Sequence, residues 1–463
     1  MNTRRKFIRN ASFIGVGLAG LKMFACGSPT TPVAVESAKK LPLDYGPLEV
    51  DPKGLLNLPK GFNYKIISTV GDPMADGLLL PGAPDGMAAF ELEDGKMAVV
   101  RNHELSSMQK SVGPFGAENE KLKEYAPEQL YEYGKGVAPA LGGTSTFIFN
   151  EETMEIEKTW MSLAGTVRNC SGGAMPWGSW VTCEEDVSKI GDYDGNYEKN
   201  HGYAFEVPVT TDPKLHAPVP LKAMGRFNHE ACVCDPKTGI IYLTEDRPDG
   251  CMYRFIPNVK GKLAEGGKLQ AMMIKEKPTF YTRNWIDQPN DPMEMSKFYQ
   301  TEWLDMDNVE APEDDLRFRA QEKGAAVFAR GEGIWFGENE FYVACTNGGL
   351  NLKGQIFRYI PGQGEGEGNE GQLELFVEPN DENIMKYCDN LTIAPWGDVM
   401  ICEDDTHSYL RGVSPEGEVF TFGKTIDPIG EFTGICFSPS GKTMFVNIQH
   451  EGLTLAITGP WKG

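Results

Sequence analysis

The sequence predicts an all-β chain, and more narrowly a six-bladed β-propeller with helical insertions between the blades. Long helical patterns are scarce, and short runs of β-branched and aromatic residues broken by Gly, Pro and Asp dominate. A hairpin-like pattern recurs six times along the chain. Two charge-rich segments interrupt this strand pattern. Together these three observations give the fold class.

The internal repeat carries the prediction of a propeller. Each copy is an apolar strand, a turn with Gly or Pro and a second apolar strand, which is a β-hairpin. Two copies, NCSGGAMPWGSWVTCEED and CDNLTIAPWGDVMICEDD, share a PWG turn and a CE-acid ending that a coincidental β-sandwich would not explain. The copies span residues 84–104, 169–186, 229–246, 331–348, 388–405 and 432–449. Hairpins at irregular spacing predict a propeller in which each hairpin is the inner part of one blade.

Two further segments, 105–135 and 290–323, are rich in charged residues and have helical character. They lie outside the hairpin copies. We therefore expect them to be helical insertions between blades.

The first 26 residues are typical of an export signal. Arg4 and Arg5 are followed by Phe7, an apolar run over 11–20 and a small residue before Cys26. The charged start and short apolar core fit a secretory signal that is too short to span a membrane stably. The paired arginines resemble the twin-arginine signal, although an ordinary secretory signal can contain two arginines by chance.

The Ala-Cys pair that ends at Cys26 resembles the end of a bacterial lipobox, so Cys26 is the expected lipidation site. We therefore expect three parts: a signal over 1–26, a flexible tether over 27–45 and a single β-propeller domain over 46–463. Such a protein lies in the periplasm or cell envelope and contacts the membrane only through its lipid anchor.

The charge of the chain excludes some partners. The 463 residues include 44 Lys plus Arg and 66 Asp plus Glu, a net charge of −22. The signal holds five of the basic residues and no acidic one, so the remainder has 39 basic against 66 acidic residues, or −27. Such a surface repels a phosphate backbone, and nucleic acid is not an expected partner. Only six His residues argue against a zinc site built from histidines.

The repeat also predicts a site, because the start of the first strand and the end of the second lie side by side in an antiparallel hairpin. Both sets of residues should gather at one mouth of the central channel. The aligned first positions are Asp85, Cys170, Glu230, Glu332, Asp389 and Thr433. The aligned second positions are Glu104, Glu184, Glu245, Thr346, Glu403 and Asn447.

A ring of carboxylates repels itself and raises its own pKa values unless cations lie inside it. Carboxylate oxygens suit calcium, whereas the thiolate of Cys170 suits iron, zinc or copper, so the mixed set implies more than one kind of metal. Arg330 lies two residues from Glu332 and points to the same side of a strand. An arginine beside bound cations predicts a polyanionic ligand that it grips.

At this point the residues carry a family resemblance. NCSGG followed by PWGSWVTCEE, then GRFNHEA, FARGEG and CDNLTIAPWGDVMICEDD, closely resemble the PhoX-type alkaline phosphatases from about residue 85 to 447. The resemblance implies a six-bladed propeller exported by the twin-arginine route, with ferric iron, Fe(III), and calcium, Ca(II). It also implies hydrolysis of small phosphate monoesters. The chain is compact for this family, so loops that shape the substrate pocket are expected to be missing.

The resemblance assigns roles residue by residue. Cys170 would be the iron thiolate and Arg330 would contact the phosphate, so these two are the expected catalytic residues. The expected metal cage is Cys170, Glu185, Glu230, Asp246, Glu332 and Asp389. Whether Glu184 or Glu185, and Glu245 or Asp246, faces the metals depends on strand phase, because neighbours point to opposite faces, and we favour the second of each pair.

Two other functions remain open at this level. One is a calcium-dependent propeller hydrolase such as a lactonase, which has no use for the thiolate of Cys170. The other is a binding propeller of the cell envelope in which calcium only joins the blades, and which has no use for Arg330. A monomer is expected in each case. His103 and His229 are expected either to form hydrogen bonds at the channel rim or to bind metal.

Overall fold

The computed structural model describes residues 44–426 and 429–462. The chain divides into two compact units, Met1–Leu41 and Pro42–Gly463. The signal, Cys26 and the tether up to residue 43 lie outside the described residues. Only the second unit is therefore described below.

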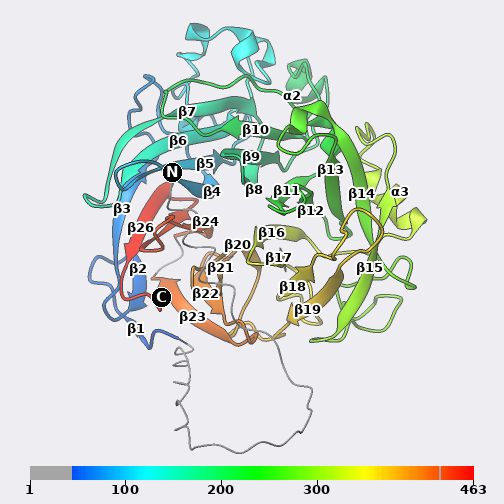
Figure 1. The fold of residues 1–463 in the computed structure, drawn as a ribbon. Helices are drawn as coiled ribbons and strands as arrows, with labels where there is room; N and C mark the ends of the chain where they lie inside the picture. Colours follow the sequence, from blue (N-terminus) through cyan, green and yellow to red (C-terminus); the bar gives the residue numbers. More distant parts are fainter. Residues whose placement is uncertain (1–43, 427–428, 463) are drawn as a thin grey trace, which may run out of the picture. The chain divides into compact units, whose positions relative to one another are not determined.

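The second unit consists mostly of strands in a propeller-like arrangement of sheets around a common centre (Figure 1). One four-stranded sheet has the order β4 (Pro84–Glu91), β5 (Lys96–His103), β6 (Gly142–Asn150) and β7 (Glu155–Thr166). A three-stranded sheet follows with β8 (Asn169–Met175), β9 (Ser179–Glu184) and β10 (Ala204–Pro208).

A nine-stranded sheet contains two runs of four strands that are joined edge to edge through β15 (Phe298–Asp305). The first run is β11 (His229–Cys234), β12 (Ile241–Glu245), β13 (Met252–Pro257) and β14 (Gly267–Ile274). The second run is β16 (Gly331–Phe336), β17 (Phe341–Cys345), β18 (Gln355–Ile360) and β19 (Gln372–Val377).

Two further sheets complete the ring, and both include strands from the N-terminal part of the unit. One has β20 (Cys388–Ile393), β21 (Val399–Glu403), β22 (Tyr409–Val413), β23 (Val419–Thr425), β2 (Leu56–Pro59) and β1 (Leu48–Glu49). The other has β24 (Phe432–Phe437), β25 (Thr443–Ile448), β26 (Leu453–Thr458) and β3 (Asn63–Thr69). Since β3 pairs with β26, an early strand is the outer strand of the last sheet and ties the two ends of the ring together.

The six predicted hairpins form, and their first strands surround the centre of the unit. These strands are β4, β8, β11, β16, β20 and β24 (Figure 1). Each contacts the next, and β24 contacts β4, so the ring is closed. The channel mouth is therefore built from parts of the chain that are hundreds of residues apart.

One irregularity recurs in all six inner hairpins of the described chain. Pairing between the first and second strands shifts register after the first paired positions, which leaves two residues of the first strand unpaired, a β-bulge. The unpaired residues are Asp85–Gly86, Cys170–Ser171, Glu230–Ala231, Glu332–Gly333, Asp389–Asn390 and Gly434–Ile435. A bulge changes the direction of a side chain, so in five of these six copies the first unpaired residue is aimed toward the centre, whereas the sixth copy has Gly434 there.

Helices are short in the described residues: α2 (Asp192–Gly195) and α3 (Leu316–Lys323), with 3-10 turns at Lys110–Val112, Leu122–Glu124, Pro127–Gln129, Gly134–Gly136, Lys222–Met224 and Leu263–Glu265. The expected helical insertions thus differ from the structure. Residues 105–135 form only 3-10 turns and connect β5 to β6 inside one sheet, because Gly113, Pro114 and Pro127 interrupt any helix. Residues 290–323 do connect two inner hairpins, but they contain the strand β15 as well as α3.

The expected tether reaches into the folded unit. Tyr45 packs edge to face against Phe62, with 5.1 Å between the ring centroids, and lies 6.0 Å from Trp461 near the C-terminus. The folded part therefore starts before residue 46.

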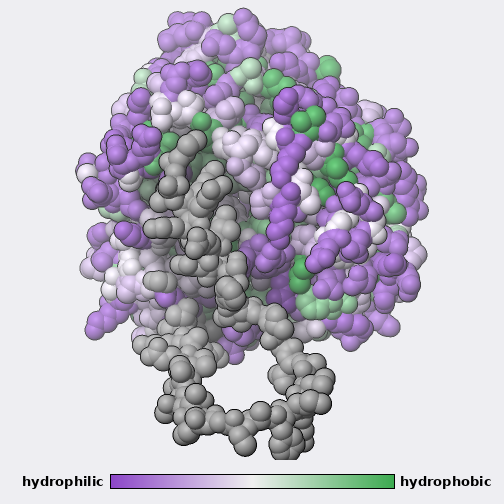
Figure 2. Space-filling model, viewed as in Figure 1, coloured by the Kyte–Doolittle hydropathy of each residue, from purple (hydrophilic) through white to green (hydrophobic). Residues whose placement is uncertain are grey.

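Apolar side chains fill the space between neighbouring sheets, and the face drawn in Figure 2 is mainly hydrophilic where it is coloured. Nine cysteines of the described residues are buried free thiols. None of the described helices combines the length and the apolar character that a membrane crossing needs.

Candidate metal centre

An acidic cavity of about 210 Å³ lies where the inner strands converge. Among the described residues, nine carboxylates line it, together with two arginines, one thiol and one amide. The lining residues are Asp85, Glu104, Arg168, Cys170, Glu185, Glu230, Asp246, Arg330, Glu332, Asp389, Asp404, Glu431 and Gln449. The expected gathering of acidic side chains at one channel mouth therefore occurs.

Two repeated positions supply most of these side chains. The first is the first bulge residue of the inner strands, which gives Asp85, Cys170, Glu230, Glu332 and Asp389. The second is the residue that directly follows the second strand, which gives Glu104, Glu185, Asp246, Asp404 and Gln449. In the last copy the bulge begins at Gly434, whereas Thr433 is paired with Asn447 and donates a hydrogen bond to the carbonyl of Pro84. Thr433 is the second residue of its inner strand, as Cys170 is of β8, but the bulge of the last copy begins one residue later and Thr433 does not line the cavity. The alignment of second positions was off by one at Glu104 and Thr346, which follow their strands, whereas Glu184, Glu245 and Glu403 end theirs.

Glu184 faces away from the cavity, into the interior of its sheet. Its carboxylate accepts hydrogen bonds from the backbone N–H groups of Val167 and Gly202 at 3.0 and 2.9 Å. It also lies 2.6 Å from Nδ1 of His201. Burial alone would lower the pKa of His201, but Glu184 and Glu132 outweigh burial and raise it to about 9. Glu184 therefore pairs with a buried, charged histidine.

Glu245 is the equivalent residue in the third hairpin and also faces away from the cavity. It accepts hydrogen bonds from the backbone N–H of Cys251 at 3.0 Å and from the hydroxyl of Tyr253 at 3.1 Å. Burial raises the pKa of Glu245 to about 7, against the opposite effect of Arg317. In both pairs the second acidic residue lines the cavity and the first supports the strand behind it.

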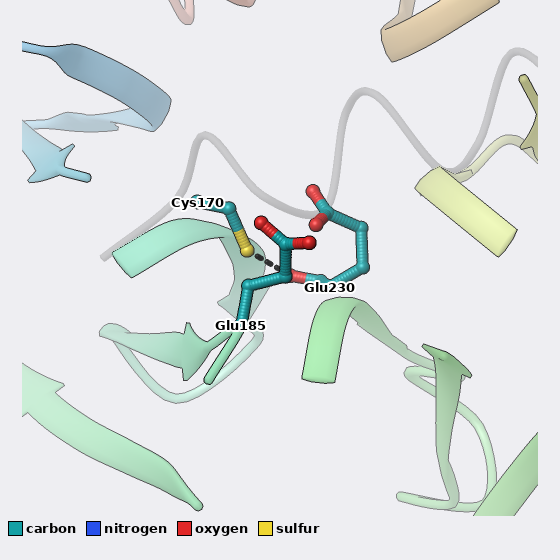
Figure 3. Close-up of side chains that lie close together, drawn as sticks. All are labelled: Cys170, Glu185 and Glu230. Atoms are coloured by element: carbon teal, nitrogen blue, oxygen red, sulfur yellow. Dashed lines mark hydrogen bonds between the residues drawn. The ribbon is translucent and has the colours of Figure 1, made fainter. Parts of the chain in front are cut away.

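Two groups of potential ligands lie inside the cavity. In the first, the Sγ atom of Cys170 and carboxylate oxygens of Glu185 and Glu230 all lie within 4.8 Å of one another (Figure 3). In the second, oxygens of Glu230, Glu332 and Asp389 meet the same limit. Glu230 belongs to both groups, so one carboxylate joins a site containing a thiol to a site made only of carboxylates.

Two backbone carbonyl groups contact the thiol of Cys170. Its Sγ lies 3.4 Å from the carbonyl oxygen of His229 and 3.5 Å from that of Glu230. Figure 3 shows the sulfur pointing toward the carboxylate of Glu185. Burial, followed by the charges of Glu230 and Glu185, raises the pKa of the Cys170 thiol well above its usual range. A thiolate therefore requires a cation beside it here.

Arg330 is oriented by two carboxylates of the cavity. Its Nε and Nη2 donate to the two carboxylate oxygens of Asp246 at 2.9 and 3.1 Å, and Nη2 also donates to Glu332 at 2.7 Å. Nη1 lies 3.9 Å from Asp404 and has no hydrogen bond within the described residues. The side chain is 32% exposed, so one edge of the guanidinium is fixed and the other is available to a ligand.

The remaining charges in the cavity are poorly compensated. Burial raises the pKa of Asp85, Glu230 and Glu332 well above their usual range, and neighbouring carboxylates add to this effect. Burial and Asp404 raise the pKa of Asp389 to about 7, although Arg330 acts in the opposite direction. Burial and Asp404 raise that of Glu431 to about 10.

The donor set fits bound cations. Oδ1 of Asp85 is buried and has no hydrogen-bond partner in the described chain. Two guanidinium groups cannot neutralise nine carboxylates, and uncompensated buried carboxylates are costly. Oxygen ligands suit hard ions such as calcium, and a thiolate with carboxylates suits a transition metal such as iron.

Sequence reasoning missed several cavity residues: Arg168, Asp404, Glu431 and Gln449. A signal for Arg168 was present, because it stands two residues before Cys170 as Arg330 stands two residues before Glu332. The CE-acid ending likewise pointed to Asp404, which follows Glu403 as Glu185 follows Glu184. Glu431 and Gln449 also occupy repeat positions. Glu431 stands two residues before Thr433, as Arg168 stands before Cys170, and Gln449 directly follows β25, as Glu185 follows β9.

His103 and His229 do not line the cavity. His103 forms hydrogen bonds through Nδ1 to the carbonyl of Gly82 at 3.0 Å and through Nε2 to the hydroxyl of Ser145 at 2.8 Å. Nε2 of His229 donates to the carbonyl of Gly225 at 3.0 Å. Both side chains thus act in hydrogen bonding.

The fold and the cavity define a propeller-like protein that gathers acidic ligands at one channel mouth. The model of the family described as alkaline phosphatase PhoX matches residues 43–155 and 148–452, nearly the whole described chain. The chain belongs to the PhoX alkaline phosphatase family. It is thus a phosphoric monoester hydrolase, and membership implies that its activity depends on metal ions.

Solved structures agree with this fold. The chain is similar to Pseudomonas fluorescens PhoX in complex with vanadate, a transition-state analogue, with 18% identity and a TM-score of 0.67 over 91% of this chain and 99% of that one. It is similar to a gluconolactonase from Xanthomonas campestris with 12% identity and a TM-score of 0.41, over 90% and 98% of the two chains. A likeness that low carries no argument. No curated protein sequence matches the chain.

Proposed function

We propose that the chain hydrolyses small phosphate monoesters with iron and calcium held in the acidic cavity. The observation that carries this proposal is the shared carboxylate of Glu230, which joins the group containing Cys170 to the group made of carboxylates. Cys170, Glu185 and Glu230 would hold ferric iron, and Glu230, Glu332 and Asp389 would hold calcium. Asp85, with an unpaired buried oxygen, is a further ligand candidate.

When bound, these metals would supply Lewis acidity and neutralise charge on the phosphoryl group. The chain's own residues bind and orient the substrate. Asp246 and Glu332 fix the guanidinium of Arg330, so that its Nη1 can donate to a phosphate oxygen without further ordering. Arg168 brings a second positive charge to the same cavity.

We also propose the number of blades, the export route, the lipid anchor and the oligomeric state of the active unit. The sheets correspond to six blades, with the nine-stranded sheet counted as two blades joined through β15. The paired arginines at positions 4 and 5 support twin-arginine export to the periplasm or cell envelope, and Cys26 supports a lipid anchor. The active unit would be a monomer.

The test combines metal analysis with a matched pair of cysteine variants. We expect the purified protein to contain iron and calcium together. Cys170→Ala should lose its iron and at least a hundredfold in kcat for a generic phosphomonoester, with an unchanged circular dichroism spectrum. Cys436→Ala, at a buried thiol outside the cavity, should keep both metals and activity.

Unchanged hydrolysis by Cys170→Ala would contradict the proposal. Calcium without iron would favour a calcium-dependent lactonase-like hydrolase or a propeller joined by calcium without catalysis.

A further inference from the structure

A second cavity, of about 320 Å³, adjoins the acidic one where the first and last inner hairpins meet. The two cavities share three lining residues: Glu104, Arg168 and Gln449. These residues form one hydrogen-bonded wall, because Arg168 donates to Glu104 Oε1 at 2.7 Å and Gln449 donates to Glu104 Oε2 at 2.9 Å. A ligand that extends past these three residues would therefore lie in both cavities.

The second cavity differs from the first in chemistry. Glu104 is its one carboxylate among the described residues, and this group is already paired with Arg168. Val70, Leu105 and Val112 supply apolar surface, beside the polar side chains of Gln109, Gln449 and His450. A cavity of this kind accepts a neutral, partly apolar group and offers little to a metal ion.

The walls of the second cavity are fixed by backbone hydrogen bonds. Gly82 donates to the carbonyl of Val112 at 2.8 Å, and Val70 donates to the carbonyl of Gly452 at 2.8 Å. The backbone N–H of Arg168 donates to the carbonyl of Leu105 at 3.0 Å. The cavity is therefore a formed site and not a space between independent loops.

Arg168 occupies the same place in its hairpin as Arg330. Each residue directly precedes an inner strand and has a positive φ, 47° for Arg168 and 50° for Arg330, which is unfavourable for a residue with a side chain. Each donates through Nε and Nη2 to the acidic residue that follows the second strand of the preceding inner hairpin, Glu104 or Asp246. Nη1 of Arg168 has no hydrogen bond within the described residues, and its side chain is 42% exposed.

We infer that the second cavity is the subsite for the alcohol group of the ester and that Arg168 is a second substrate-contacting arginine. This inference rests on the proposed phosphatase function. The phosphoryl group lies in the acidic cavity, the alcohol group lies against Val112 and Leu105, and Arg168 donates to an oxygen of the phosphoryl group from the shared wall. The preferred substrates are monoesters of uncharged alcohols with an apolar part.

The test compares two alkyl esters with similar leaving groups, ethyl phosphate and 2-phenylethyl phosphate. Val112→Phe fills the second cavity and should lower kcat/KM for 2-phenylethyl phosphate at least tenfold, while that for ethyl phosphate and the Ki of inorganic phosphate stay within twofold. Gln109→Trp, at an exposed residue of the same cavity, should act in the same direction if Val112→Phe fails to fold. Val137→Phe, at an exposed valine of the same connection between β5 and β6 but outside the cavity, is the matched control and should change kcat/KM for neither ester.

Arg168→Lys tests the arginine itself. It should raise the Ki of inorganic phosphate about tenfold and lower kcat/KM for both esters. Both values are measured on protein with the iron and calcium content of the wild type, because Arg168 also donates to Glu185 at 2.7 Å. Equal loss for both esters in Val112→Phe, no loss for either, or an unchanged phosphate Ki in Arg168→Lys would overturn the inference. Failure of the proposed function itself would be visible earlier, as a wild-type protein that hydrolyses neither ester.

Discussion

Adjacent residues at the end of β9 have different tasks because side chains on a strand alternate between faces. Glu185 lines the acidic cavity with Cys170, whereas Glu184 holds a buried histidine and the backbone of the loop before β8. Both residues are glutamates, so the same substitution at each position shows the effect of side-chain direction alone.

Glu185→Gln and Glu184→Gln should therefore fail in different ways. Glu185→Gln removes a proposed metal ligand and should lose iron, while the metal-free protein is no less stable because one repelling charge is gone. Glu184→Gln places amide hydrogens against backbone N–H donors and should lower the free energy of unfolding by about 2 kcal/mol with iron retained. Metal analysis and urea unfolding measure both effects. Loss of iron in both variants would show that Glu184 also contacts metal.

Arg330 makes a second residue-scale prediction. Arg330→Lys keeps the charge but loses the paired hydrogen bonds to Asp246, so the cation is no longer oriented. We expect kcat/KM to fall at least tenfold and the Ki of inorganic phosphate to rise. Arg358 pairs with Glu374 on an outer strand, so Arg358→Lys is the control and should leave kcat/KM and the Ki of inorganic phosphate unchanged. An Arg330→Lys enzyme with normal kcat/KM would exclude a contact between Arg330 and phosphate.

At the scale of elements, the repeated β-bulge determines where the ligands point, and it was not visible in the sequence. The internal repeat identified the hairpins, and the family resemblance favoured Glu185 and Asp246 over their neighbours. Neither located the bulge, because the register shift depends on backbone pairing that no residue type in the six copies marks. For that reason Thr433 was expected at the channel mouth, although the bulge of its copy begins one residue later and leaves it outside the cavity lining.

The short insertions were misjudged for a related reason. Charged residues in 105–135 suggested helices, but glycines and prolines within the segment allow only single 3-10 turns. In 290–323 the strand β15 alternates between buried and exposed residues, but its charged neighbours obscured this pattern in the sequence, so the strand was not predicted. Local composition therefore identified that insertions exist but not their secondary structure.

Closure of the ring by β3 gives an element-scale prediction. Phe62 lies between β2 and β3 and contacts Phe422 at 5.1 Å and Trp461 at 4.7 Å between ring centroids, so it joins the early strands to the C-terminal part. Phe62→Ala should lower the free energy of unfolding by about 3 kcal/mol while kcat at 20 °C stays normal. Phe298→Ala, at a phenylalanine 40% exposed, is the control and should cost less than about 1 kcal/mol. If urea unfolding showed the same loss of free energy of unfolding for Phe62→Ala and Phe298→Ala, the contacts of Phe62 would not contribute specifically to ring closure.

At the scale of the whole molecule, acidic residues exceed basic ones by 22, and the acidic cavity concentrates part of this excess. In the folded chain these carboxylates line one cavity. The metal-free state therefore carries an electrostatic cost that the unfolded chain does not have. Cation binding removes this cost, so metal loading and folding stability are linked.

This linkage has a predictable pH dependence. The pKa of Asp389 is raised to about 7 and that of Glu431 to about 10, both above their unfolded values near 4. A raised pKa gives stability that is fully present below the unfolded pKa and is lost as pH rises through the folded pKa. Chelated protein should thus melt at progressively lower temperature from pH 5 to pH 9, and added calcium should stabilise it most at pH 9.

Thermal melting in chelator and in calcium at pH 5, 7 and 9 measures the effect. Calcium at a hundred times its Kd should add about 2.7 kcal/mol. Asp389→Asn, which removes one repelling carboxylate, should reduce the loss of melting temperature in chelator. A chelated protein that is equally stable at pH 5 and pH 9 would contradict this account.

The sixth bulge has a consequence for symmetry. Five copies of the hairpin place a carboxylate or thiol of the acidic cavity at the first bulge residue, but the last copy has Gly434 there, with φ of 62° and no room for a Cβ beside the carbonyl of Asp85. The series of bulge side chains is therefore interrupted at one point. That point is the seam at which the first and last copies meet, the same seam that holds the second cavity. The repeat is thus only pseudo-symmetric, and at this seam the sixth copy lines the acidic cavity with Glu431 and Gln449 instead of a bulge residue.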